Sequence, residues 1–182
     1  MGISLSNDYK FLFQNRSHFV TSQSSTQWKT LDIWIEQHQS DLFKVLEEPG
    51  KYILFGEWLY AKHSIHYTNL PGYFIAFDIF DLKQGQFLSV VQRDQILSNT
   101  TIPIVTRLGN GKYTLDQLKQ MLKTQQSSFY NGPLEGLYFR IDNNQFLKER
   151  AKAVRSDFLG VDNGEEVEHW SKKQLVKNIV RY

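Results

Sequence analysis

The run Tyr73–Phe80 (YFIAFDIF), which is apolar nearly throughout, limits the fold more than any other segment of the chain. A strand with one face in water alternates apolar and polar residues, whereas a continuous apolar run indicates a strand that is buried on both faces. The run is rich in aromatic and β-branched residues, and Pro71-Gly72 stands just before it. A chain of 182 residues is long enough to bury such a core.

Other short segments with strand composition surround this run. Ile3–Leu5 and Tyr9–Phe13 flank the turn residues Ser6-Asn7-Asp8, which is the pattern of a hairpin. We predict further strands at Tyr52–Phe55, Phe87–Val91 and Leu134–Ile141.

Three segments predict helices. Apolar residues recur at near-helical spacing over Trp28–Leu46, and Pro49-Gly50 ends that pattern. Thr114 with Gln117 forms a capping box ahead of a second helix. The stretch from Glu165 to the C-terminus predicts one or two basic, amphipathic helices. Since strands and helices mix without βαβ regularity, we expect an α+β fold with a largely antiparallel sheet.

Composition excludes several classes of protein. The chain has no cysteine, which rules out disulfides and cysteine zinc sites and suits a reducing compartment. No apolar run approaches the roughly 20 residues that span a membrane, and the N-terminus lacks the apolar core of a signal peptide. The net charge of +2 permits a polyanionic partner without requiring one. We therefore expect a cytoplasmic protein that binds no membrane.

Four short motifs follow one another at wide separations along the chain. They are Gln14–His18 (QNRSH), Phe55–Trp58 (FGEW) with Ala76–Ile79 (AFDI), Leu134–Leu137 (LEGL), and Arg150–Arg155 (RAKAVR). In this order they resemble the motifs of the covalent nucleotidyltransferases, in the branch of the ATP-dependent RNA ligases. The closing stretch His169–Lys173 (HWSKK) with Asn178 is also similar to the end of RNA-ligase domains.

This resemblance implies a fold and a chemistry. The fold would be the nucleotidyltransferase domain shared by ligases and capping enzymes, ATP-grasp-like, with two largely antiparallel sheets and flanking helices, covering 1–182 as a single domain. In the family, a lysine attacks the α-phosphate of ATP, AMP passes to an RNA 5′-phosphate, and a 3′-hydroxyl displaces AMP. The implied cofactors are ATP and Mg²⁺, the implied partners are nicked or broken RNA ends, and the implied role is RNA repair.

The first motifs assign residues to the nucleotide. By resemblance Phe77 would stack on adenine, although core packing is the alternative for so apolar a strand. Glu57 would accept a hydrogen bond from the ribose. A carboxylate in an apolar strand is costly unless it is paired, so we expect Glu57 to be buried with a partner; a strand-end residue in solvent is the alternative. Arg16 would bind phosphate through its forked donors, or form a surface ion pair.

The later motifs assign residues to catalysis and metal binding. Glu135 would face the Mg²⁺ side of the pocket, since this ion prefers carboxylate oxygens. Lys152 would neutralise the α-phosphate, with Arg155 or Arg150 as a second cation. A solvated charged face is the alternative for these cations. Asp78 is a further candidate for the metal. Gly136 permits a close approach of the backbone.

The nucleophile motif of the family, Lys-x-Asp-Gly, does not occur in the 182 residues. Met1–Leu5 resembles the strand that follows this motif, so we expect the N-terminal strand or strands that carry it to be missing. The chain would then be unable to adenylate itself. Three explanations are open: a misplaced start codon or frameshift, which we favour; a split enzyme, in which a second polypeptide supplies the lysine strand; or a decayed domain that binds nucleotide or RNA without catalysis.

Two observations separate the ligase from other functions. A nucleic-acid-binding module of another class would show a continuous basic stripe with exposed aromatic side chains. A purely structural protein would not need Glu57 and Glu135 within apolar strands. The ligase hypothesis therefore predicts that these two carboxylates converge in one pocket.

Overall fold

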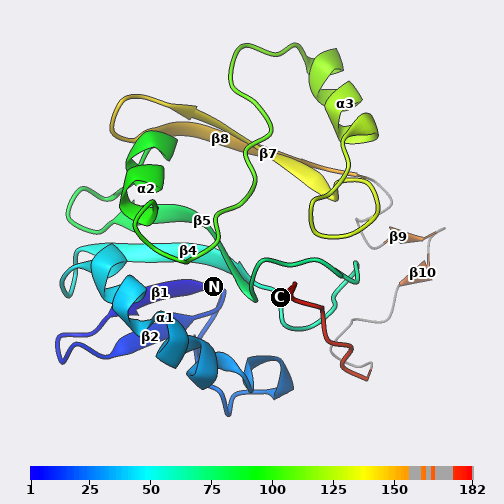
Figure 1. Cartoon of the computed structure of the whole chain (residues 1–182). Coiled ribbons are helices and arrows are strands. Elements are labelled where there is room, and N and C mark those ends of the chain that lie inside the picture. Colours follow the sequence, from blue (N-terminus) through cyan, green and yellow to red (C-terminus); the bar gives the residue numbers. More distant parts are fainter. Residues whose placement is uncertain (156–160, 163–164, 167–173, 182) are drawn as a thin grey trace. The chain divides into compact units, whose positions relative to one another are not determined.

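A six-stranded antiparallel sheet, in the order β3-β2-β1-β4-β5-β6, organises the first part of the computed structural model (Figure 1). The structure describes residues 1–155, 161–162, 165–166 and 174–181. They form two compact units. Unit 1 contains Met1–Tyr60, Gly72–Val105 and Ile141–Glu149, and unit 2 contains Ala61–Pro71, Thr106–Arg140 and the described residues from Arg150 onward. The prediction of a single domain over 1–182 stays a prediction.

Most strands of the six-stranded sheet lie where the sequence predicts them, but the strand at Phe19–Val20 was not predicted. They are β1 (Gly2–Leu5), β2 (Phe11–Gln14), β3 (Phe19–Val20), β4 (Tyr52–Trp58), β5 (Phe74–Asp81) and β6 (Gln86–Phe87). The predicted hairpin is confirmed, because β1 pairs with β2 in antiparallel register. On its other side β1 pairs with β4, a contact between distant parts of the chain. The apolar run is confirmed as an interior strand, β5, with β4 and β6 as neighbours.

Helix α1 (Leu31–Leu46) supplies the core of unit 1 on one face of this sheet. A short 3₁₀ turn, η1 (Thr26–Trp28), comes before it, so the predicted helix from Trp28 begins three residues later than expected. The α1 side chain of Trp34 packs edge-on against Trp58 of β4 and Phe74 of β5, at 6.0 and 5.2 Å between ring centroids. Such aromatic pairs add about 0.5–1.5 kcal/mol beyond their buried area.

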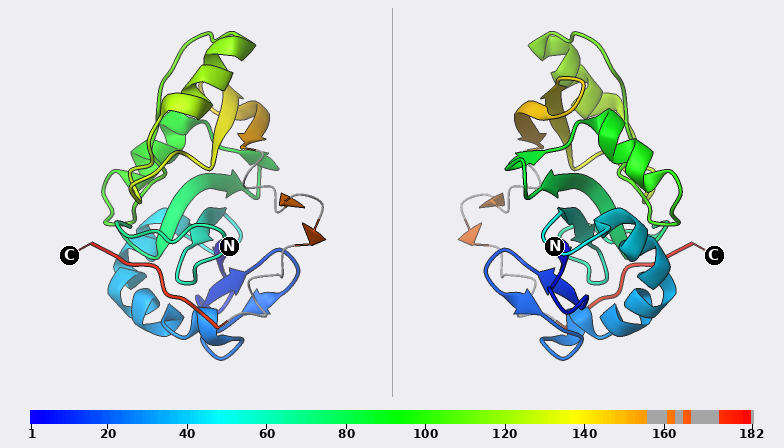
Figure 2. Two further views of the ribbon diagram at one scale, coloured as in Figure 1. Left: turned by 90° about the vertical axis from the view of Figure 1, so that its right-hand side faces the viewer. Right: turned by 90° about the vertical axis from the view of Figure 1, so that its left-hand side faces the viewer.

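The prediction of a strand at Phe87–Val91 is wrong beyond Phe87. β6 ends there, and α2 (Val90–Leu97) begins after Ser89. The Ser89 side chain accepts a hydrogen bond from the backbone N–H of Gln92, and the Asp142 carboxylate accepts one from that of Val90. These acceptors satisfy backbone donors that a helix start leaves open. Both α1 and α2 lie on the same face of the sheet (Figures 1 and 2).

Unit 2 contains α3 (Leu115–Thr124), and the two strands that follow α3 in the sequence are divided between the two units. The capping box of α3 is confirmed, since Thr114 and Gln117 exchange backbone-to-side-chain hydrogen bonds of 2.8 and 3.3 Å. Strand β7 (Gly136–Asp142) confirms the strand predicted at Leu134–Ile141, and it pairs with β8 (Leu147–Val154), which the sequence pattern missed. At Gly136 a side-chain carbon would lie 2.6 Å from the Ala153 carbonyl oxygen, so this position needs glycine.

The predicted C-terminal helices are wrong in the part of the chain that the structure describes. Glu165–Glu166 form β10, paired with β9 (Val161–Asp162), and residues 174–181 are not helical. Backbone groups of Val176 and Ile179 instead bond to the segment Ala61–Pro71, for example Lys62 N–H to the Val176 carbonyl at 2.7 Å. His169 and Trp170 lie outside the described residues. No helix in the described part of the chain is long and apolar enough to span a membrane.

Candidate functional site

The junction of β4 and β5 carries two of the predicted site residues, Glu57 and Phe77. Phe55 pairs with Asp78, but the next residue, Gly56, pairs with Ala76. The register therefore shifts, and Phe77 is the extra residue of a β-bulge. Bulges often occur next to functional sites, where they change the direction of a side chain. The side chain of Phe77 is therefore not bound to the regular alternation of β5.

Gly56 explains why the motif places glycine ahead of the glutamate. A side-chain carbon at this position would overlap the Phe74 ring and lie 2.6 Å from the Ile75 carbonyl oxygen. Only glycine allows β4 and β5 to approach this closely. Gly56 is thus a packing requirement of the strand pair that holds Glu57 and Phe77.

Glu57 is exposed, so the expectation of a buried carboxylate is wrong. The reason is alternation: Gly56 and Trp58 are buried, and Glu57 between them points to the other face of β4. The α-amino group of Met1 lies near it, donating a hydrogen bond to the Gly56 carbonyl oxygen at 2.7 Å. Burial lowers the pKa of this amine, and the Glu57 charge acts in the opposite direction.

Arg16 stands exposed in the turn between β2 and β3. The turn is held by Asn15, whose side-chain oxygen accepts hydrogen bonds from the backbone N–H groups of Ser17 and His18, both at 2.9 Å. This arrangement fixes the backbone on both sides of Arg16 and leaves its guanidinium accessible to an anion.

Asp78 and Phe77 have different surroundings. Asp78 is only 1% exposed, whereas Phe77 is half-buried. A hydrated metal ion cannot reach a carboxylate at this depth without a local change, and the role of Asp78 as a metal ligand stays a prediction. Half-burial of Phe77 leaves ring surface available for stacking.

In unit 2, Glu135 is brought together with a tyrosine and with the last motif. The hydroxyl group of Tyr67 donates a hydrogen bond to a carboxylate oxygen of Glu135 at 3.1 Å. The backbone N–H of Arg155 donates to the Glu135 carbonyl oxygen at 3.0 Å. Glu135 is exposed and lies just ahead of β7, not within a strand. Two motifs that are separated in sequence therefore meet at this residue.

The cations of the last motif differ in exposure. Arg150 and Lys152 are exposed on β8, at positions that share one face by strand alternation, and Arg155 is half-buried just beyond the strand. Arg155, with its backbone bonded to Glu135, is the stronger candidate for the second cation. A set of exposed cations and one carboxylate can bind a phosphate group.

The predicted site residues are divided between the two units. Arg16, Glu57, Phe77 and Asp78 belong to unit 1, and Glu135, Lys152 and Arg155 belong to unit 2. The convergence of Glu57 and Glu135 in one pocket stays a prediction. Among the described residues there is no group of three or more His, Asp or Glu side chains that could hold a metal ion. A single carboxylate such as Glu135 still fits Mg²⁺, which usually takes one or two protein carboxylates and completes its shell with phosphate and water.

The sequence model of the RNA ligase family matches residues 1–154. The chain belongs to the RNA ligase family. No curated protein matches the chain, and no solved structure matches it. The matched region of this RNA ligase family member contains all the predicted site residues except Arg155, which follows it directly.

Two residues around the candidate site of this family member, Tyr67 and Arg93, were missed by the sequence analysis, and Asn178 was named only for its resemblance to the end of RNA-ligase domains. Tyr67 contacts Glu135, Arg93 contacts the Phe77 carbonyl, and Asn178 bonds to the Tyr67 backbone N–H at 2.9 Å. Arg93 and Asn178 are buried, at 4% and 2% exposure. Buried polar side chains normally form hydrogen bonds, so their burial would have marked both residues as candidates. Nothing in the sequence indicated that burial, because both residues lie in polar segments.

Proposed function

We propose that this chain is the catalytic domain of an ATP-dependent RNA ligase with the nucleotidyltransferase fold. It would join an RNA 5′-phosphate to a 3′-hydroxyl through adenylated intermediates, in the cytoplasm. The observation that carries this proposal is the β4–β5 junction. Glu57 and Phe77, from two motifs 20 residues apart, lie on paired strands at a β-bulge. The family match over residues 1–154 supports it.

The proposed roles in unit 1 concern the nucleotide. Phe77 stacks on adenine, an interaction worth about 1–3 kcal/mol per base. Glu57, whose carboxylate is exposed, accepts a hydrogen bond from a ribose hydroxyl. Arg16, on its ordered turn, binds phosphate through parallel N–H donors. These three side chains supply an apolar surface, an acceptor and a cation, which are the groups that adenosine phosphates require.

The proposed roles in unit 2 concern the reacting phosphate. Lys152 and Arg155 neutralise negative charge as it develops on the phosphate oxygens. Glu135, oriented by the Tyr67 hydroxyl, is the protein carboxylate for Mg²⁺. When bound, Mg²⁺ would supply charge neutralisation at the phosphate. Tyr67 keeps one carboxylate oxygen of Glu135 in place by hydrogen bonding, and Glu135 would hold Mg²⁺.

We propose that these 182 residues do not perform the covalent first step, because no Lys-x-Asp-Gly sequence occurs in them. The last step needs no lysine. The RNA 3′-hydroxyl oxygen attacks the phosphorus of an adenylated 5′ end, a P–O bond forms, the bond to AMP breaks, and AMP leaves. We propose that the chain performs this sealing step, and that a lysine outside these 182 residues would supply the earlier steps.

Sealing of a pre-adenylated nicked RNA in the presence of Mg²⁺ tests this proposal. We expect slow but measurable sealing by the 182-residue chain, and a loss of at least tenfold in Glu135→Gln and Lys152→Met, the size of removing one charged transition-state contact. Lys83→Ala, which breaks an exposed ion pair with Glu48, is the matched surface control and should seal normally. No sealing at all would refute the catalytic role.

A second candidate function follows from the same absent motif: a module that binds nucleotide or RNA without catalysis. ATP binding by the chain, measured by titration calorimetry, together with failure to seal the pre-adenylated nick would support it. Incubation with α-labelled ATP and denaturing electrophoresis completes the set. We expect no label on this chain, and a labelled band would show that another residue acts as the nucleophile.

A further inference from the structure

Arg93 is a buried arginine that none of the proposed roles uses. It lies in α2 and is 4% exposed, although guanidinium groups are costly to remove from water unless all their donors find partners. Its Nε and Nη2 donate to the Asp94 carboxylate at 2.8 and 2.6 Å. Its Nη1 donates to the backbone carbonyl oxygen of Phe77 at 2.7 Å.

The carbonyl that Arg93 bonds to is that of the bulged residue. At a β-bulge the local ladder of hydrogen bonds is disrupted, so an acceptor there needs a partner from outside the strand pair. The backbone groups of the neighbouring Ala76 also bond outside the β4–β5 pair. The Ala76 N–H donates to the Pro103 carbonyl oxygen at 2.8 Å, and the Ala76 carbonyl oxygen accepts from the Val105 N–H at 2.9 Å. The bulge is therefore held by the Arg93 side chain and by backbone contacts from Pro103 and Val105.

We propose that Arg93 is the positioning residue of the adenine-stacking ring, acting through the backbone of Phe77. The bulge frees Phe77 from the regular strand geometry, and the Arg93 guanidinium fixes the peptide that follows it. Asp94 keeps the guanidinium oriented through two hydrogen bonds to one carboxylate oxygen. The proposal rests on the function proposed above, in which Phe77 contacts adenine. Arg93 itself touches no nucleotide.

The test measures ATP affinity of the whole chain by titration calorimetry in a double-mutant cycle. Phe77→Ala should raise the Kd for ATP by roughly 5- to 150-fold, the loss of one stacked base. Arg93→Met, similar in length and uncharged, should raise it at least about threefold, since coupling between contacting residues has this size. In the Phe77→Ala background, Arg93→Met should have no further effect. Arg93→Lys, which retains one donor for the carbonyl, should fall between Arg93→Met and the unaltered chain.

Two controls separate positioning from a general loss of structure. Inorganic triphosphate carries no base, so its affinity should be the same for Arg93→Met and the unaltered chain. Lys83→Ala breaks an exposed ion pair with Glu48 in unit 1 and should leave ATP affinity unchanged.

The outcomes distinguish this inference from the proposed function. Equal losses of ATP affinity from Arg93→Met in both backgrounds, or a parallel loss of triphosphate affinity, would overturn the positioning role. A normal Kd in Arg93→Met beside a raised Kd in Phe77→Ala would also overturn it, leaving the stacking role intact. A normal Kd in Phe77→Ala, or no binding of ATP by the unaltered chain, would instead refute the proposed nucleotide site.

Discussion

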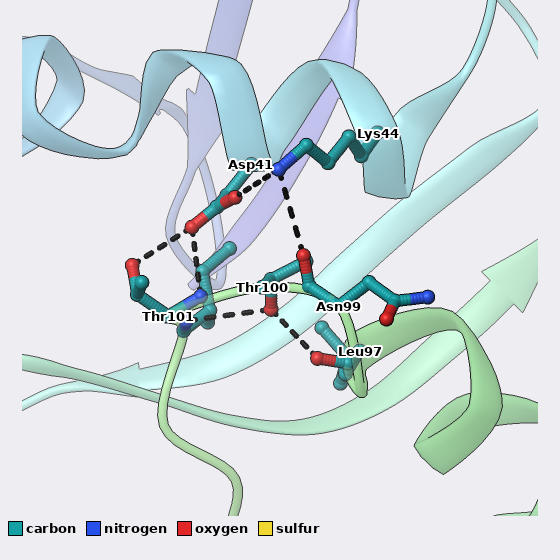
Figure 3. A network of polar contacts seen from close by, with 7 residues as sticks. Asp41, Lys44, Leu97, Asn99, Thr100 and Thr101 are labelled. Carbon is teal, nitrogen blue, oxygen red and sulfur yellow. Dashed lines mark hydrogen bonds and ion pairs between the residues drawn. The ribbon is translucent and has the colours of Figure 1, made fainter.

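Replacing Asp41 by asparagine is expected to lower the free energy of unfolding of unit 1 by about 2 kcal/mol at neutral pH. Asp41 lies near the end of α1 and is 8% exposed. Its carboxylate accepts hydrogen bonds from the backbone N–H and the hydroxyl group of Thr101, at 2.7 and 2.8 Å, and from Lys44 at 3.0 Å (Figure 3). The network ties α1 to the segment that follows α2.

The magnitude follows from the ionisation of Asp41. Burial opposes the charged form, but the hydrogen bonds from Thr101 and Lys44 outweigh it and lower the pKa from 3.8 to about 2. A depressed pKa means that the folded state binds the proton more weakly than the unfolded chain, so the stabilisation is complete above about pH 5 and is lost as the pH falls towards 2. A difference of nearly two pKa units corresponds to about 2 kcal/mol at neutral pH and to about 1 kcal/mol at pH 3.

Urea unfolding followed by tryptophan fluorescence measures this effect, because Trp28, Trp34 and Trp58 are all buried in unit 1. The unaltered chain and Asp41→Asn should differ by about 2 kcal/mol at pH 6 and by about half of that at pH 3. The midpoint of thermal unfolding of unit 1 at neutral pH should fall by about 8–16 °C.

Two lysines that form ion pairs in the same unit serve as controls. Lys44 is half-exposed, so Lys44→Ala should cost less than about 1 kcal/mol, and Lys83→Ala at the exposed Glu48 pair should cost close to nothing. A stability difference for Asp41→Asn that stays constant between pH 6 and pH 3, or that is absent at pH 6, would refute the reasoning from the depressed pKa.

Three further substitutions test the fold. Gly56→Ala should destabilise unit 1 by about 1–3 kcal/mol in urea unfolding, because the added carbon meets the Phe74 ring; an unchanged midpoint would contradict the close strand approach. Thr114→Ala removes the cap of α3 and should speed hydrogen exchange there, at a cost of about 1 kcal/mol, while Thr114→Ser should retain protection. Asn178→Ala should cost about 1 kcal/mol by removing the acceptor of the part-buried N–H of Tyr67, and equal exchange at Tyr67 in both proteins would argue against that.

Local sequence patterns predicted the helices and strands that are specified by residues close together in the sequence. The apolar run of β5, the helical spacing of α1 and the capping box at Thr114 all depend on neighbours within a few residues. The same reasoning failed where a weak local signal competed with composition. β-Branched valines favoured a strand at Phe87–Val91, but the cap at Ser89 and the Asp142 carboxylate start a helix instead.

For the candidate site, too, the sequence predicted some features and not others. The residue types of Arg16, Glu57 and Phe77 and their order could be predicted because chemistry restricts them. Exposure of Glu57 could not, since it depends on which face of β4 turns from the core. The contact between Tyr67 and Glu135 joins residues 68 positions apart, and no periodicity encodes such a pair.

The sequence by itself determined the family, because the family is defined by the types of its motif residues and by their order along the chain. It also determined the strand–helix composition of most of unit 1, through the spacing of apolar side chains. Only the tertiary structure decided the β-bulge at Phe77, the burial of Arg93 beneath it and the bonding of residues 174–181 to the segment Ala61–Pro71. Each of these arises where a backbone group loses its regular partner and must find another from a distant part of the chain.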